Sequence, residues 1–191
     1  MPSSRIDPSD AFILFADLQQ GIADLQLTIS AERLKKGVLS LAKLARLFEI
    51  PAIVTGVPTG EGAPKFMEEI ELGMGKVQTC VRTTADSFRN EEIAAAIDKS
   101  GRKTLLISGV ATELAVQLPA LTGVDLGYRT FVVVDACAGT SERTERAALD
   151  RILAHGGSTT SIINLAGELA GDFREPKGQE ALGIVFSAAR Q

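Results

Sequence analysis

The sequence predicts an α/β protein: a three-layer α/β/α, Rossmann-like sandwich built on a six-stranded, mostly parallel sheet. Short apolar runs alternate with helical patterns along the 191 residues, as in parallel strands joined by right-handed helical crossovers. Residues 11–16, AFILFA, are continuously apolar, as in a strand that is buried on both faces. With 45% hydrophobic residues, the chain can fill one core. We therefore expect a single domain over residues 1–191, with its core in residues 11–173 and a C-terminal tail over 174–191.

The first half of the chain supplies three of the expected strands. The strand over residues 11–16 ends at Asp17. A helix is predicted over residues 31–48, because its apolar side chains recur every three or four positions: Leu34, Val38, Leu41, Ala45 and Phe48. Residues 57–75 contain several Gly and Pro, and we expect them to form a flap or interface segment. The other expected elements are a strand over 51–56, a short helix over 64–72, a strand over 77–81 and a helix from Asn90 to a stop at Gly101.

The second half supplies the other three strands and the tail. A strand over 103–108 leads into a helix over 112–123, which Pro119 should kink because proline removes a backbone hydrogen bond. The tail is mixed from Asp172 on, but its ALGIVFSAA is apolar enough to pack on the body or on a neighbouring subunit, so we expect a homo-oligomer. The remaining expected elements are a strand over 129–135, a helix over 141–155, a strand over 158–163 and a helix over 165–170.

Composition and charge exclude several classes of function. The net charge is −4 and no basic face is evident, which disfavours a nucleic-acid partner. The apolar runs are too short to span a bilayer, which takes about 20 residues, and the polar N-terminus lacks the apolar core of a signal peptide. Two cysteines form no disulfide framework, so we expect a cytoplasmic protein. The single histidine, His155, excludes a histidine-rich metal site. We expect neither a metal nor another cofactor.

Three polar features follow predicted strands and should meet at one edge of the sheet. Asp17 ends the first strand, Arg82 ends the third, and the turn over residues 109–112 ends the fourth. Ligands bind beyond the carboxyl ends of parallel strands. An acid, a fixed cation and a helix N-terminus could there move a proton and stabilise a developing negative charge.

Each of these residues also has an ordinary structural explanation. An Asp after a strand is often a helix cap or a turn former, and a lone Arg is often a solvated surface charge. Thr112 fits the N-cap of its helix. Glu113, in the first turn, could simply complement the helix dipole.

Four motifs together resemble the isochorismatase-like cysteine hydrolases. FILFADLQQGI, RTTADSF, ISGVATELAV and LGYRTFVVVDACAG come in the order and spacing of that superfamily, and the match covers roughly residues 11–173. The helix ELAVQLPAL with its internal proline, followed by LGY, is similar to the YcaC-type branch. The resemblance implies an Asp acid or base in a D-x-Q motif, a Lys before a Ser-Ala-Phe-like segment, and a Cys nucleophile in the helix after G-V-x-T.

Carried onto this chain, the resemblance matches the acid but departs at the other two positions. Asp17 matches the acid, Arg82 stands where the Lys is expected, and Ala115 stands where the Cys is expected. The resemblance further implies a non-proline cis peptide at Val110–Ala111, whose amide groups would form an oxyanion hole. The substrate-binding residues that it implies are Gln19, Phe88, Val110, Ala111 and Thr112.

The departures change the expected chemistry. Alanine has no nucleophilic atom, and arginine stays protonated but can bind a carboxylate through two hydrogen bonds. Cys80 shares a strand face with Arg82, but a cysteine in an apolar strand is usually a core residue. Cys137 is better explained by packing, and His155 by a position at a helix C-terminus.

Three hypotheses remain open. The first is hydrolysis of a small carboxylate-bearing substrate without a covalent intermediate, since certain isochorismatases lack the cysteine and cleave a vinyl ether with the Asp as general acid. The second is an inactive family member that acts as a small-molecule binding or oligomeric scaffold protein. The third is an engineered Cys-to-Ala variant of a cysteine amidohydrolase, although Arg82 argues against a single engineered change.

Overall fold

A six-stranded parallel sheet forms the centre of the computed structural model, which describes residues 5–59 and 62–189. The strand order is β3-β2-β1-β4-β5-β6, and all neighbouring strands pair in parallel. The expected fold class is therefore confirmed. The strands are β1 (Ala11–Ala16), β2 (Ala52–Gly56), β3 (Gln78–Val81), β4 (Thr104–Val110), β5 (Arg129–Ala138) and β6 (Ser158–Thr160).

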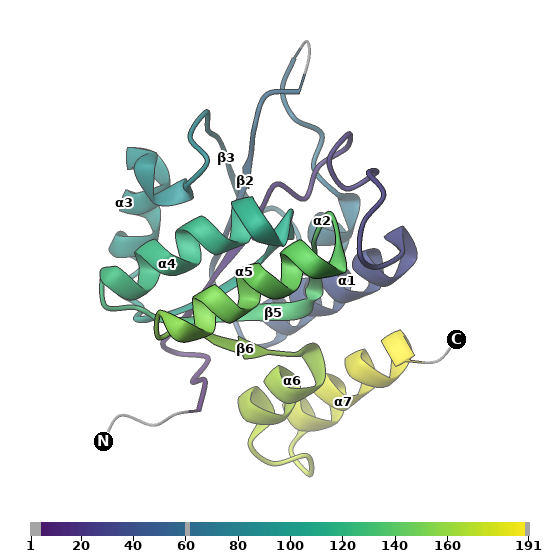
Figure 1. Cartoon of the computed structure of the whole chain (residues 1–191). Helices are drawn as coiled ribbons and strands as arrows, with labels where there is room; N and C mark the ends of the chain where they lie inside the picture. The colour runs from purple at the N-terminus through teal and green to yellow at the C-terminus, as the bar shows by residue number, and fades with distance from the viewer. Residues whose placement is uncertain (1–4, 60–61, 190–191) are drawn as a thin grey trace.

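Helices cover both faces of this sheet, as Figure 1 shows with α4 and α5 in front of it and α1 behind it. One face packs against α1, α2, α6 and α7, and the other against α3, α4 and α5. The helices are α1 (Ala31–Leu47), α2 (Glu68–Met74), α3 (Glu91–Lys99), α4 (Gln117–Asp125), α5 (Glu142–Ala154), α6 (Ile162–Ala170) and α7 (Pro176–Ala189), with a 3₁₀ turn η1 (Ser87–Arg89) and a π-helix η2 (Thr112–Val116).

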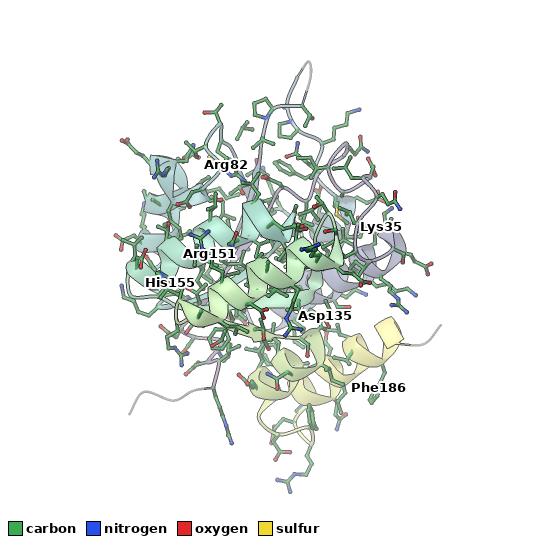
Figure 2. All side chains as sticks on the ribbon, viewed as in Figure 1. Lys35, Arg82, Asp135, Arg151, His155 and Phe186 are labelled. Carbon is green, nitrogen blue, oxygen red and sulfur yellow. The ribbon has the colours of Figure 1, made fainter. Side chains whose placement is uncertain are left out.

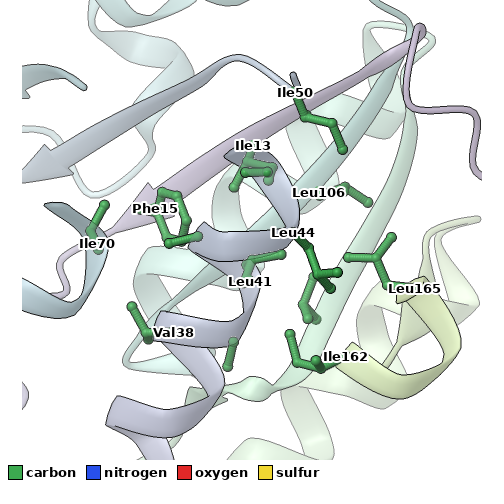
Figure 3. Close-up of a cluster of buried hydrophobic side chains, with 14 of the residues drawn as sticks. Ile13, Phe15, Val38, Leu41, Leu44, Ile50, Ile70, Leu106, Ile162 and Leu165 are labelled. Carbon is green, nitrogen blue, oxygen red and sulfur yellow. The ribbon is translucent and has the colours of Figure 1, made fainter. Parts of the chain in front are cut away.

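Two hydrophobic cores lie on the two faces of the sheet, and β1 contributes to both. Ile13 and Phe15 pack with the α1 side, whereas Phe12 and Leu14 pack with the α3–α5 side. This alternation explains why the strand is apolar at every position. Figure 3 shows the α1 side, where Leu41 and Leu44 of α1 lie among side chains of β1 and α6.

The helix α1 lies close to the sheet because of one glycine. Ser30 caps its N-terminus by accepting a hydrogen bond from the Arg33 amide. At Gly37 an added Cβ would lie 1.9 Å from the backbone oxygen of Asp135 on β5. Only glycine therefore allows this approach of helix to strand.

The segment after β4 differs in helix type from the single helix, kinked at Pro119, that is expected over residues 112–123. It begins as the π-helix η2 and continues as α4 from Gln117. Pro119 has no backbone N–H to donate to the carbonyl group of Ala115, and its ring crowds the preceding turn. That preceding turn is the wider π-helix η2. The irregularity is therefore a change of helix type in the turn before the proline.

Two further differences concern the C-terminal third. The strand expected over residues 158–163 ends at Thr160, because Ser161 caps α6 and the Asp135 carboxylate accepts a hydrogen bond from the Ile162 amide. The tail forms α7, with Pro176 at its first position, where proline is favoured. Its buried residues Ala181, Ile184 and Val185 pack against the body of the same chain.

No helix in the described part of the chain is both long enough and apolar enough to cross a membrane.

Two helix glycines provide a matched test of the α1 packing. We expect Gly37→Ala to lower the free energy of unfolding by about 1–3 kcal/mol, because the new methyl group must displace the β5 backbone. Gly183→Ala, on α7, meets nothing within 4 Å and should raise stability by up to about 1 kcal/mol through helix propensity. Urea denaturation measures both variants. Equal effects would show that the close approach at Gly37 has no energetic importance.

Candidate functional site

The strands β1, β2, β3 and β4 have their carboxyl ends at the same edge of the sheet, so the loops that follow them lie close together. Ala16 of β1 is level with Thr55 of β2 and with Gly109 of β4. One step further, the Asp17 amide donates to the Thr55 carbonyl group at 2.9 Å, and the Arg82 amide donates to Gly56 at 2.8 Å. The register of the sheet therefore places Asp17 and Arg82 at the same edge.

A buried ion pair joins these two residues. Arg82 Nη2 donates to Asp17 Oδ2 at 2.7 Å, and the two side chains are only 1% and 7% exposed. Arg82 Nη1 donates to the Thr84 carbonyl group, which ties the guanidinium to its own loop. Asp17 has a positive φ of 55°, a conformation that aspartate tolerates better than most residues. The pair leaves Asp17 Oδ1 and Arg82 Nε buried without a partner among the described residues.

Burial decides the protonation behaviour of Asp17. Loss of solvation raises its pKa, and the charge and hydrogen bond of Arg82 oppose this effect without cancelling it. A carboxyl group with a raised pKa retains its proton to higher pH than an ordinary aspartic acid. Asp17 therefore has the properties of a general acid as well as those of an ion-pair partner.

The turn after β4 forms the next wall of the site. The Val110–Ala111 peptide bond is cis. The Ala115 amide donates to the Ala111 carbonyl group at 3.0 Å, and the Ala115 side chain is buried at 1% exposure. Val110 and Thr112 are also buried. Residue 115 thus offers a methyl group, with no nucleophilic atom, in the first turns of this helix.

Glu113 fixes this turn to the start of α5. Its Oε1 accepts hydrogen bonds from the Thr140 amide and hydroxyl, both at 2.9 Å, and from the Thr144 hydroxyl. Thr112 donates to Glu145 of α5 at 2.8 Å. Burial opposes ionisation of Glu113, but the hydrogen bonds from Thr144 and Thr140 outweigh it, so its pKa is lowered. Glu113 therefore lies in the first turn of η2 and also links this turn to the start of α5 through its hydrogen bonds.

Sequence reasoning missed Thr140, Thr144 and Glu145. The signal available was the segment GTSERTE, in which Ser141 caps α5 and hydroxyl groups recur around the cap. Such a segment indicates a helix start, but it does not show that a glutamate from another helix will bind there.

Gln19 follows Asp17 in the sequence and Phe88 follows Arg82, but both side chains have partners outside the ion pair. The Gln19 side-chain amide is fully buried, donates to the Val57 carbonyl group at 2.8 Å and accepts from the Val57 amide at 2.9 Å. It thereby holds the start of residues 57–75, of which 60 and 61 lie outside the described residues. The Phe88 ring packs 5.9 Å from that of Tyr128, which lies just before β5. The structure does not bring Phe88 to Asp17.

Neither cysteine nor the histidine is bonded to the ion pair. Cys80 Sγ lies 3.4 Å from Glu92 Oε2, and burial together with Glu92 raises its pKa. Cys137 is buried, which raises its pKa to about 12. His155, the C-cap of α5, pairs with Asp125 at 2.7 Å on the surface, and Figure 2 shows it well below Arg82 in that view. Both thiols are poor nucleophiles in these surroundings.

Within residues 5–59 and 62–189, no group of three or more His, Cys, Asp or Glu side chains could hold a metal ion.

The family follows from a match over most of the chain. The model of the isochorismatase domain matches residues 11–163. The chain belongs to the isochorismatase family. This range contains Asp17, Arg82 and the whole turn after β4.

Individual relatives agree with the family and with the YcaC branch. The probable hydrolase YcaC of Escherichia coli is 33% identical over 97% of this chain and 89% of its own length. The crystal structure of the E. coli YcaC gene product, an octameric hydrolase of unknown specificity, has a TM-score of 0.89 at 31% identity, covering 98% of this chain and 92% of that one. YcaC from Pseudomonas aeruginosa, with hexane-2,5-diol and covalent acrylamide, has a TM-score of 0.90 at 28% identity, covering 99% and 96%.

The Glu113 contacts make stability depend on pH. Because the pKa of Glu113 is lowered on folding, its contribution is complete above the ordinary glutamate pKa and is lost as pH falls through the folded-state pKa. We expect Glu113→Gln to lower the free energy of unfolding by about 1–3 kcal/mol at neutral pH, with little difference from wild type in acid. Denaturant titrations over a pH series measure this effect.

Glu142→Gln is the matched control, since Glu142 is an exposed acid in the first turn of α5. An equal loss for both variants, or a loss that persists in acid, would contradict the role assigned to Glu113.

Proposed function

We propose that this isochorismatase-family, hydrolase-like protein acts without a covalent intermediate, by acid/base hydrolysis of a small carboxylate-bearing substrate at Asp17. The buried Asp17 carboxyl group carries the proposal, because its pKa is raised and its Oδ1 has no partner among the described residues. Ala115, at the position where the resemblance expects the nucleophile, supplies no atom for an acyl-enzyme.

Asp17 acts as the general acid in this proposal. A general acid is most effective when its pKa lies near the working pH, and burial shifts Asp17 in that direction. The proton that Asp17 gives to the substrate is recovered when water adds and the bond to the leaving group breaks. One water is consumed, and no oxidant or reductant is needed.

Arg82 positions the acid and binds one substrate oxygen. Nη2 and Nη1 are already bound to Asp17 and Thr84, whereas Nε has no partner among the described residues and can donate to a substrate carboxylate. The peptide N–H groups around Val110, Ala111 and Thr112 bind further polar oxygens in this proposal. Gln19 contributes by holding the loop at Val57 through two hydrogen bonds. Phe88 contributes by packing its ring against that of Tyr128.

Asp17→Asn tests the acid. We expect the variant to lose turnover of any substrate found among small carboxylates with vinyl ether, ester or amide bonds, because an amide cannot donate the required proton. The wild-type rate should fall as pH rises through the raised pKa of Asp17. Product formation by liquid chromatography measures both effects, and circular dichroism checks folding.

Asp24→Asn is the control, since Asp24 is an exposed acid on the following loop. It should retain the wild-type rate. Equal rates in wild type and Asp17→Asn would remove Asp17 from the mechanism.

A second candidate function is ligand binding without turnover. The observation that favours it is the pairing of unpartnered polar atoms on Asp17 and Arg82 with a residue 115 that has no nucleophilic atom. Under this alternative, small carboxylates raise the melting temperature and no product forms. Appearance of product would discard it.

A third candidate is that Ala115 replaces the cysteine of an ordinary amidohydrolase. In that case Ala115→Cys should show thiol-dependent amidase activity that iodoacetamide abolishes, while Cys80 and Cys137 react slowly because both are buried. Ala120→Cys, at a buried alanine of α4, which continues η2, is the control and should remain inactive. Continued inertness of Ala115→Cys would contradict this candidate.

We further propose a cytoplasmic homo-oligomer. The E. coli YcaC relative is octameric, and Phe186 on α7 is 53% exposed, which leaves apolar surface to bury. Figure 2 shows this side chain on α7, below the body of the protein. Both cysteines are free thiols, which agrees with a reducing compartment.

A further inference from the structure

A cavity of about 390 Å³ lies between α1, β5, α6 and α7 and shares no residue with the Asp17 site. Its size is within the range of small-molecule sites, about 300–1,000 Å³. Its apolar walls come from the loop before α1, from α6 and from α7: Ile29, Ile162, Ile163 and Val185. Gly37 of α1 also lines the cavity, at the point where the helix lies closest to the β5 backbone.

The charges at the cavity favour an anionic ligand. Arg33 lines it with an exposed guanidinium that has no partner in the described part of the chain. Lys36 also lines it, although this ammonium group already pairs with Glu32 at 3.1 Å. A free guanidinium beside an apolar wall can bind a carboxylate through two parallel hydrogen bonds.

The acid of the cavity, Asp135, is already engaged. Both of its carboxylate oxygens accept from the Ile162 amide, at 2.9 and 3.1 Å, so it caps α6. Figure 2 shows Asp135 on the α6 side of the molecule, well below Arg82 in that view. An amine ligand would have to compete with this capping contact, whereas a carboxylate on Arg33 would not.

We propose that this cavity binds a small amphipathic carboxylate, with its carboxylate on Arg33 and its aliphatic part among the Ile and Val side chains. The site is independent of the hydrolytic proposal, because it lies on the α1 face of the sheet and uses none of the residues that surround Asp17. Binding there would bridge α1, α6 and α7, and would therefore stabilise the C-terminal helices against the body.

Isothermal titration of the full chain with hexanoate, octanoate and decanoate tests the proposal. Arg33→Gln removes the guanidinium, and Ile163→Glu places a like charge at the rim on a side chain that is 65% exposed and so does not affect folding. Arg46→Gln, on the same helix, and Leu153→Glu, at an exposed position of α5, are the matched controls. Octylamine serves as the cationic probe of the same length as octanoate.

At least one carboxylate should bind wild type, and Arg33→Gln and Ile163→Glu should each weaken it about tenfold or more. The two controls should bind as wild type does, and so should Asp17→Asn at a temperature where circular dichroism shows it to be folded. The proposal is overturned if none of the three carboxylates binds, if octylamine binds as well as octanoate, or if Asp17→Asn alone abolishes binding. It is also overturned if Ile163→Glu leaves carboxylate binding unchanged but dissociates an oligomer in sedimentation, since a second copy would then cover this face.

Discussion

The buried ion pair between Asp17 and Arg82 determines the geometry at the carboxyl end of the sheet. Neither charge has access to much water, so each depends on the other. Removing one partner of such a pair costs about 3–5 kcal/mol, because the remaining charge is left unpaired. The pair also connects β1 to the loop after β3 through Thr84. An acid with a raised pKa can exist here because the guanidinium compensates only part of the cost of burial.

The segments around this pair are held mainly by contacts to backbone groups and by a few carboxylates. Gln19 holds the loop after β2, and Glu113 holds the turn after β4 to the start of α5. Gly139 links the same region to the loop after β1, since its amide donates to the Thr28 hydroxyl and its carbonyl accepts from the Thr28 amide, both at 3.0 Å. Hydrogen bonds between the surrounding loops therefore hold the site in place, whereas the buried methyl group of Ala115 only fills space.

Much of the fold could be predicted from the sequence, because strands such as β1 and β4 are apolar runs and α1 has a periodic apolar stripe. The strand over 11–16 and the helix over 31–48 agree with the structure to within one residue. The meeting of Asp17 and Arg82 was predictable from their places at strand ends. The Glu113–Thr140–Thr144 contacts were not, because they depend on how α5 packs against η2. The helix α7 was also missed, since its periodicity is weak and its order comes from packing on α1 and α6.

The titration of the Asp17 carboxyl group by ¹³C NMR, assigned by its absence in Asp17→Asn, tests the central claim most directly. Burial beside a single guanidinium predicts a pKa clearly above that of an ordinary aspartic acid. A pKa at or below the ordinary value would show that Arg82 dominates and that Asp17 is a permanent anion, which would contradict its assignment as a general acid.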